Sequence, residues 1–148
     1  MKKNNIFQQC GFLLIAIAAI LMTSCKAEKS FPVKESVKDI TGSWQVIRAT
    51  RNGTDLTGII DFTKFRVNFK DGAYTIENPL PFLVNADGKF ALDDPEYPFK
   101  ITFTAIGAAA PVSTPFNYPV VNGKRQLSIT FSPGCPNNSY VYVLQKVN

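Results

Sequence analysis

The stretch FRVNFKDGAYTIE, residues 65–77, decides the fold class. Aromatic or aliphatic side chains alternate with polar ones over residues 65–70, which is the period-two pattern of a strand with one buried face. Asp71-Gly72 follows, and this dipeptide favours a two-residue hairpin because both turn positions take positive φ. Residues 73–77 then alternate in the same way, so the stretch predicts an antiparallel hairpin.

The same short-strand pattern recurs on both sides of this hairpin. Strong candidates are residues 44–50, 99–106, 126–131 and 140–146, and weaker ones are residues 80–84, 88–92 and 116–121. Asn52-Gly53 and Asn122-Gly123 add turn signals, and one short helical turn is expected within residues 55–62. Eight or nine short strands with no long helical pattern predict an all-β, antiparallel barrel or sandwich.

The N-terminal segment has the layout of a secretory signal. Lys2 and Lys3 precede an apolar, uncharged run over residues 11–22, and this run is shorter than the roughly 20 residues that cross a bilayer. A signal anchor or a buried core helix is the alternative. Residues 21–25, LMTSC, resemble a lipobox of the Bacteroidetes type. The resemblance implies that Cys25 carries diacylglycerol, that cleavage occurs before it, and that its amine is acylated with a chain such as palmitate.

These features divide the chain into three parts. We expect a signal helix that is removed over residues 1–24, a flexible lipidated tether over residues 25–38, and a β domain over residues 39–148. Two or more acyl chains anchor a protein stably, so the expected location is the cell envelope, on a membrane. By resemblance to lipoprotein signals, Lys26 favours the outer membrane, because an aspartate at that place retains many lipoproteins at the inner membrane.

The numbers of cysteines, charged residues and histidines limit which disulfides, partners and catalytic groups the chain can have. Once Cys10 is removed and Cys25 is lipidated, Cys135 has no partner for an intrachain disulfide; without lipidation, a Cys25–Cys135 bridge is the alternative. Removal of Lys2 and Lys3 leaves 14 basic against 11 acidic side chains, a net charge of +3. That is ordinary for a small domain, so no nucleic-acid partner is expected. The chain lacks histidine, the commonest general base and metal ligand.

Gly42-Ser43-Trp44 at the start of the first strand resembles the G-x-W signature of lipocalins. With Asn52-Gly53 and the closing residues 142–146, the chain is similar to small lipocalin-like lipoproteins of Bacteroidetes with no assigned function. The resemblance implies an up-and-down barrel of about eight strands over residues 39–148, with Trp44 at one end. It also offers Arg125 as the late arginine that packs on the tryptophan.

Three groups of side chains are candidates for chemistry. Asp93-Asp94-Pro95-Glu96 is interpreted as an acidic surface turn, with a Ca²⁺ site as the alternative because calcium takes several carboxylate oxygens. Since no histidine can activate it, Cys135 is interpreted as a structural or incidental cysteine, with a reactive thiol as the alternative. Aromatic side chains of the strands either fill the barrel or line an apolar pocket; the candidates are Trp44, Phe65, Phe69, Phe103 and Tyr142.

Two hypotheses about function follow. In the first, the barrel binds a small hydrophobic ligand and needs an internal cavity. In the second, the barrel is solid and meets an envelope protein partner at an exposed apolar patch, near residues 106–112 or 79–83. We expect no catalytic residue, no metal site and no cofactor.

Overall fold

A computed structural model of the protein describes residues 34–147, and within them it contains strands but no helix. The strands are β1 (Gly42–Arg51), β2 (Thr54–Asp55), β3 (Arg66–Lys70), β4 (Ala73–Glu77), β5 (Gly88–Leu92), β6 (Lys100–Ala105), β7 (Val112–Asn117), β8 (Val120–Val121), β9 (Lys124–Phe131) and β10 (Tyr140–Val147). The predicted signal segment and Cys25 lie outside the described residues.

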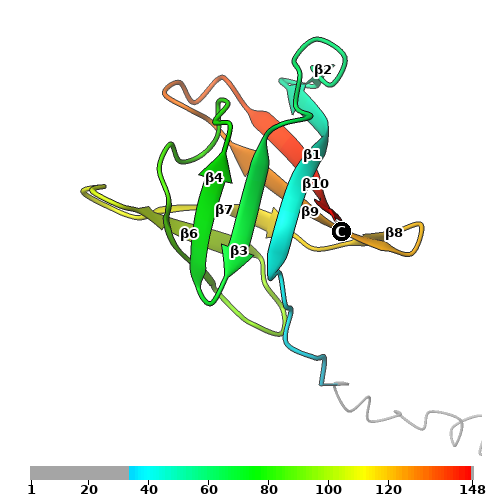
Figure 1. Ribbon diagram of the computed structural model, residues 1–148, viewed down its shortest axis with the longest axis vertical. Coiled ribbons are helices and arrows are strands. Elements are labelled where there is room, and N and C mark those ends of the chain that lie inside the picture. The colour runs from blue at the N-terminus through cyan, green and yellow to red at the C-terminus, as the bar shows by residue number, and fades with distance from the viewer. Residues whose placement is uncertain (1–33, 148) are drawn as a thin grey trace, which may run out of the picture. The chain divides into compact units, whose positions relative to one another are not determined.

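Eight of these strands close an antiparallel barrel in the order β1-β3-β4-β5-β6-β7-β9-β10. The barrel closes because β10 pairs with β1 on one side and with β9 on the other. Each long strand pairs with the next one along the chain, which gives an up-and-down meander (Figure 1). β2 pairs antiparallel with the end of β1, and β8 forms a small hairpin with β9. The predicted all-β, up-and-down barrel is confirmed, and it is compatible with a lipocalin-like fold.

The two ends of the barrel carry different segments. The tether end holds residues 34–41, the Asp71-Gly72 turn, residues 93–99 and the β8 hairpin. The free end holds the connections over residues 56–65, 78–87, 106–111 and 132–139. In Figure 1 the β3–β4 turn lies at the bottom, beside the point where the chain enters β1, and β2 lies at the top.

The core lies inside the barrel and follows the alternation of the strands. In β3, Val67 and Phe69 are buried while their neighbours face outward, and in β9 the same holds for Leu127, Ile129 and Phe131. Side chains that alternate across a strand point to opposite faces of the sheet. A closed sheet therefore collects every second residue in one interior.

The predicted turns have the backbone that their residues favour. Asp71 and Gly72 have φ of 50° and 75°, and Asn122 and Gly123 have φ of 51° and 74°. Both residues of each pair are thus left-handed, as a two-residue hairpin requires. Gly42, the glycine of the G-x-W motif, has φ of 131°, a conformation that L side chains rarely adopt.

Two details differ from the prediction. Residues 80–84, a weak strand candidate, form part of a loop, because Pro79 and Pro81 supply no amide donors for a ladder. Candidate 116–121 is divided at Pro119 into the end of β7 and β8.

The helical turn expected within residues 55–62 is present as a single turn, in which the Ile60 amide donates to the Leu56 carbonyl at 3.0 Å.

Candidate functional site

The predicted pocket residues lie inside the barrel. Each of Trp44, Phe65, Phe69, Phe103 and Tyr142 is at most 1% exposed. Two pairs among them are in ring contact, with centroids 6.4 Å apart for Phe65 and Tyr142 and 6.2 Å apart for Phe69 and Phe103. Trp44 belongs to the tether end, where its Nε1 donates to the Ile40 carbonyl at 2.8 Å. The set is therefore part of one hydrophobic core.

Phe82, which is not among the five predicted pocket residues, enters this core from a loop. It lies between Pro81 and Leu83 in the β4–β5 connection, yet its side chain is only 7% exposed. Its ring centroid lies between 5.5 and 6.2 Å from those of Phe65, Phe103, Phe131 and Tyr142. The loop thus inserts one ring at the free end of the barrel, among rings supplied by four other segments.

The hydroxyls of two buried tyrosines differ in their hydrogen bonding. Tyr142 donates to the Pro81 carbonyl at 2.7 Å, which ties β10 to the loop that carries Phe82. Burial raises the pKa of Tyr142 to about 12, with a smaller contribution from Tyr140. The Tyr74 hydroxyl is also buried and has no hydrogen-bond partner among the described residues. Burial, followed by the nearby Asp87 carboxylate, raises the pKa of Tyr74.

The segment before β1 is fastened to the tether end. The Lys38 amide donates to the Pro95 carbonyl at 2.7 Å, and the Tyr118 hydroxyl donates to the Asp39 carbonyl at 2.6 Å. Lys34 pairs with Glu96 at 3.5 Å. Residues 34–38, which the sequence assigned to the tether, therefore contact the barrel, so the point where the chain leaves the domain is close to Lys34.

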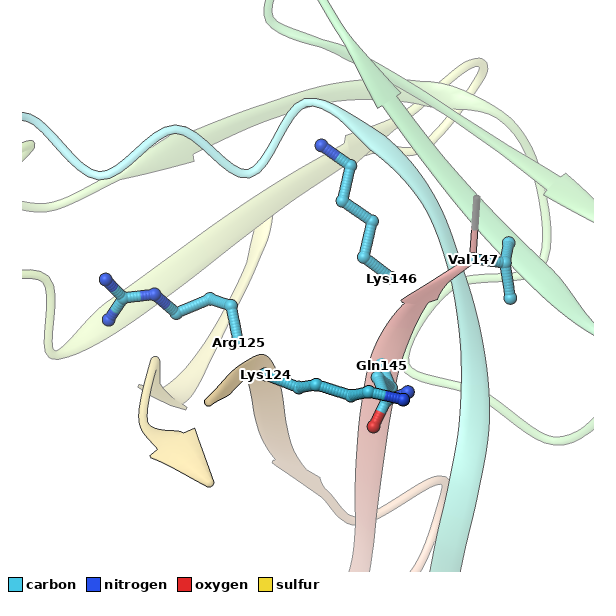
Figure 2. A pocket seen from close by; sticks show the side chains of 5 residues that line it. All are labelled: Lys124, Arg125, Gln145, Lys146 and Val147. Carbon is cyan, nitrogen blue, oxygen red and sulfur yellow. The ribbon is translucent and has the colours of Figure 1, made fainter. Parts of the chain in front are cut away.

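A basic groove lies beside this segment. Lys124, Arg125, Gln145, Lys146 and Val147 line an open hollow of about 600 Å³, and these lining residues include no acid (Figure 2). In Figure 2, Lys124 extends toward Gln145, whereas Arg125 points away from it. The groove exists because β9 and β10 pair, with Gln126 opposite Gln145.

Arg125 does not pack on Trp44 as the lipocalin resemblance suggested. Its guanidinium lies 4.5 Å from the centre of the Tyr118 ring, and Tyr118 in turn lies 6.5 Å from Trp44. The tyrosine thus stands between the arginine and the tryptophan. Near the same end, hydrogen bonds from the side chain and backbone of Thr41 lower the pKa of Asp39, and the Lys146 cation adds to this effect.

The acidic cluster organises its own loop. Asp93 accepts from the amides of Phe99 and Lys100 at 3.0 and 2.9 Å, and Asp94 accepts from those of Glu96 and Tyr97 at 2.7 and 2.9 Å. These carboxylates replace missing backbone partners in a turn. Within residues 34–147, no three His, Cys, Asp or Glu side chains are placed to hold a metal ion.

The free end is poor in charge. Residues 78–86, 106–111 and 132–139 contain no Asp, Glu, Lys or Arg. Ile106 is 76% exposed there, and Ile59 in the β2–β3 connection is 74% exposed. The predicted patch near residues 106–112 is thus exposed, whereas the one near residues 79–83 turns Phe82 inward. Cys135 is exposed in the β9–β10 loop.

The chain was compared with known proteins. A family model described as "Domain of unknown function (DUF5004)" matches residues 23–145. The searches of curated proteins and of solved structures gave no match. Across residues 34–147, no helix has the length and hydropathy that crossing a membrane requires.

Proposed function

We propose that this chain, which belongs to the DUF5004 family, is a membrane-anchored lipoprotein of the cell envelope and a non-catalytic interaction module. The contact between Phe82 and the rings of the barrel interior is the observation that carries the proposal. Rings in contact occupy the space in which a barrel would hold a ligand. A partner would therefore bind to the outer surface of the barrel.

The lipid on Cys25 supplies the anchor. Its support is the lipobox resemblance of residues 21–25, together with the preceding basic and apolar segments. We propose the outer membrane as the location. Radiolabelled palmitate fed to the host is expected to label the chain, and Cys25→Ser is expected to abolish both the label and membrane attachment. Attachment that survives Cys25→Ser would refute the anchor.

The free end is the proposed contact for an envelope protein. Three of its loops carry no charge, and both Ile106 in one of them and Ile59 in the β2–β3 connection are exposed. Exposed apolar side chains at such an end are candidates for interaction sites. A photocrosslinking residue placed at Ile106 in the living host is expected to give a discrete adduct. The matched control is Ile47, which is 42% exposed on the barrel wall. Equal adducts at both positions, or none at Ile106, would contradict this assignment.

A small apolar ligand inside the barrel is the second candidate. Two observations favour it: Phe82 is supplied by a loop, and the Tyr74 hydroxyl has no partner among the described residues. Withdrawal of the loop would remove one ring from the interior and leave room for an apolar molecule. This candidate predicts a molecule that copurifies with the chain and leaves when the chain unfolds.

A further inference from the structure

The segment before β1 lies against the tether end. The Lys38 amide donates to the Pro95 carbonyl and the Tyr118 hydroxyl donates to the Asp39 carbonyl, so residues 38–39 lie beside the β5–β6 loop and the β8 hairpin, and Lys34 adds a surface ion pair with Glu96. Nine peptide steps separate Cys25 from Lys34. A fully extended chain covers at most about 3.3–3.6 Å per residue. A lipid on Cys25 therefore keeps Lys34 within about 30 Å of the bilayer surface.

The side chains around this segment are suited to a membrane interface. Phe99 is 72% exposed, Val120 is 55% exposed and Val121 is 41% exposed. Phe99 lies beside the end of β7, where its carbonyl accepts a hydrogen bond from the Phe116 amide. This places it near Val120 and Val121, which follow β7 in the chain. Apolar side chains that flank cations are what interfacial segments insert among lipid headgroups.

The cations of the basic groove supply the complementary charge. Within residues 34–147, the ion pairs involve Lys34, Lys38 and Arg48, and none involves Lys124, Arg125 or Lys146. Among the acids of this end, Glu96 pairs with Lys34 and Glu35 with Lys38, and Asp93 and Asp94 accept amide hydrogen bonds within their own turn. Asp39 lies near Lys146, so Lys124 and Arg125 are the groove cations without a nearby carboxylate among these interactions of the described residues. A Lys or Arg near an anionic bilayer strengthens attachment by about fivefold. A tether also raises the effective concentration of the domain at the surface, so weak contacts are sufficient.

We propose that the tether end docks on the anionic headgroups of the bilayer that holds the lipid of Cys25, through Lys124, Arg125, Lys146 and the exposed Phe99, Val120 and Val121. The inference rests on the proposed lipid anchor and adds an orientation to it. The barrel then stands on its tether end and presents the free end away from the membrane.

The test uses the full lipidated chain in vesicles of phosphatidylcholine with or without phosphatidylglycerol. A polarity-sensitive fluorophore is attached to Val121→Cys in a Cys135→Ser background, and to the natural Cys135 as the free-end reference. We expect a blue-shifted emission, quenched by lipid-borne quenchers, at position 121 in vesicles that contain phosphatidylglycerol. We expect neither effect at position 135.

Removal of the three groove cations supplies the comparison. Lys124→Gln, Arg125→Gln and Lys146→Gln together are expected to weaken docking about a hundredfold, from about fivefold for each cation. Arg48→Gln, Arg51→Gln and Lys64→Gln form the charge-matched control away from the tether end and are expected to leave the blue shift in place. High salt on the parent chain tests the same charges without any substitution.

Each outcome is decisive. A chain that attaches to vesicles but keeps the fluorophore at position 121 in water would overturn the docking and leave that face to a protein partner. A shift that is equal in neutral vesicles, or that survives loss of the groove cations, would also overturn it. A chain that does not attach to vesicles at all, with no acyl mass on Cys25, would instead refute the proposed anchor.

Discussion

Two buried tyrosines differ by one hydrogen bond, and this difference predicts opposite effects of the same substitution. Tyr142→Phe removes the part-buried bond to the Pro81 carbonyl, so we expect a loss of about 1 kcal/mol in the free energy of unfolding. Tyr74→Phe removes a buried hydroxyl that has no partner among the described residues, so we expect no loss or a small gain. Urea unfolding of the two variants measures both values. A larger loss for Tyr74→Phe would contradict this account.

The raised pKa of Tyr142 predicts that the folded protein loses stability at alkaline pH. Its pKa is about 12 in the folded protein against 10.0 ordinarily, so the unfolded chain releases this proton first. The contribution of Tyr142 to stability is then complete below about pH 10 and falls as pH rises from about 10 to about 12. Urea unfolding at increasing pH is expected to show this loss, and Tyr142→Phe is expected to lack the part due to this group. Equal pH dependence in both proteins would contradict the assignment.

At the scale of elements, Gly88 controls the pairing of β5 with β6. A Cβ at this position would lie 2.1 Å from the Thr104 carbonyl oxygen, so Gly88→Ala forces the two backbones apart. We expect a loss of about 2 kcal/mol in the free energy of unfolding, within the range for overpacked sites. Gly58→Ala is the matched control, because a Cβ there meets nothing within 4 Å. Thermal unfolding of both variants makes the comparison, and equal midpoints would contradict this account.

The loop that carries Phe82 is the element that fills the free end. Phe82→Ala is expected to cost about 3 kcal/mol in the free energy of unfolding, the low end for a buried phenylalanine, because a loop can collapse into part of the space. We also expect the variant to bind an apolar fluorescent dye that the parent chain does not bind. Leu80→Ala, a half-buried change in the same loop, is the control. Dye binding by the parent chain would show that the interior is not filled.

The elements differ in how far the sequence predicts them. The β3–β4 hairpin is predictable because the alternation and the Asp71-Gly72 turn act locally. The position of Phe82 is not, because its burial depends on a barrel that other segments must first close. The basic groove is not predictable from the sequence for a related reason. Arg125 and Lys146 come from different strands and line the same groove only because β9 pairs with β10.

At the scale of the whole molecule, the two ends of the barrel have different compositions. The tether end carries the groove cations, the acidic turn and the exit of the chain, while three loops of the free end carry no charge from residue 78 to 86, 106 to 111 and 132 to 139. In our proposal the first end faces lipid and the second faces a protein partner.

The central claim is that the barrel is filled by its own side chains and acts through its surface. Native mass spectrometry of the lipidated full chain, extracted from its host, tests it most directly. We predict the mass of the polypeptide from Cys25 with its covalent acyl chains and no further small molecule. A small apolar molecule that stays bound in the folded chain and is released on unfolding would contradict the claim.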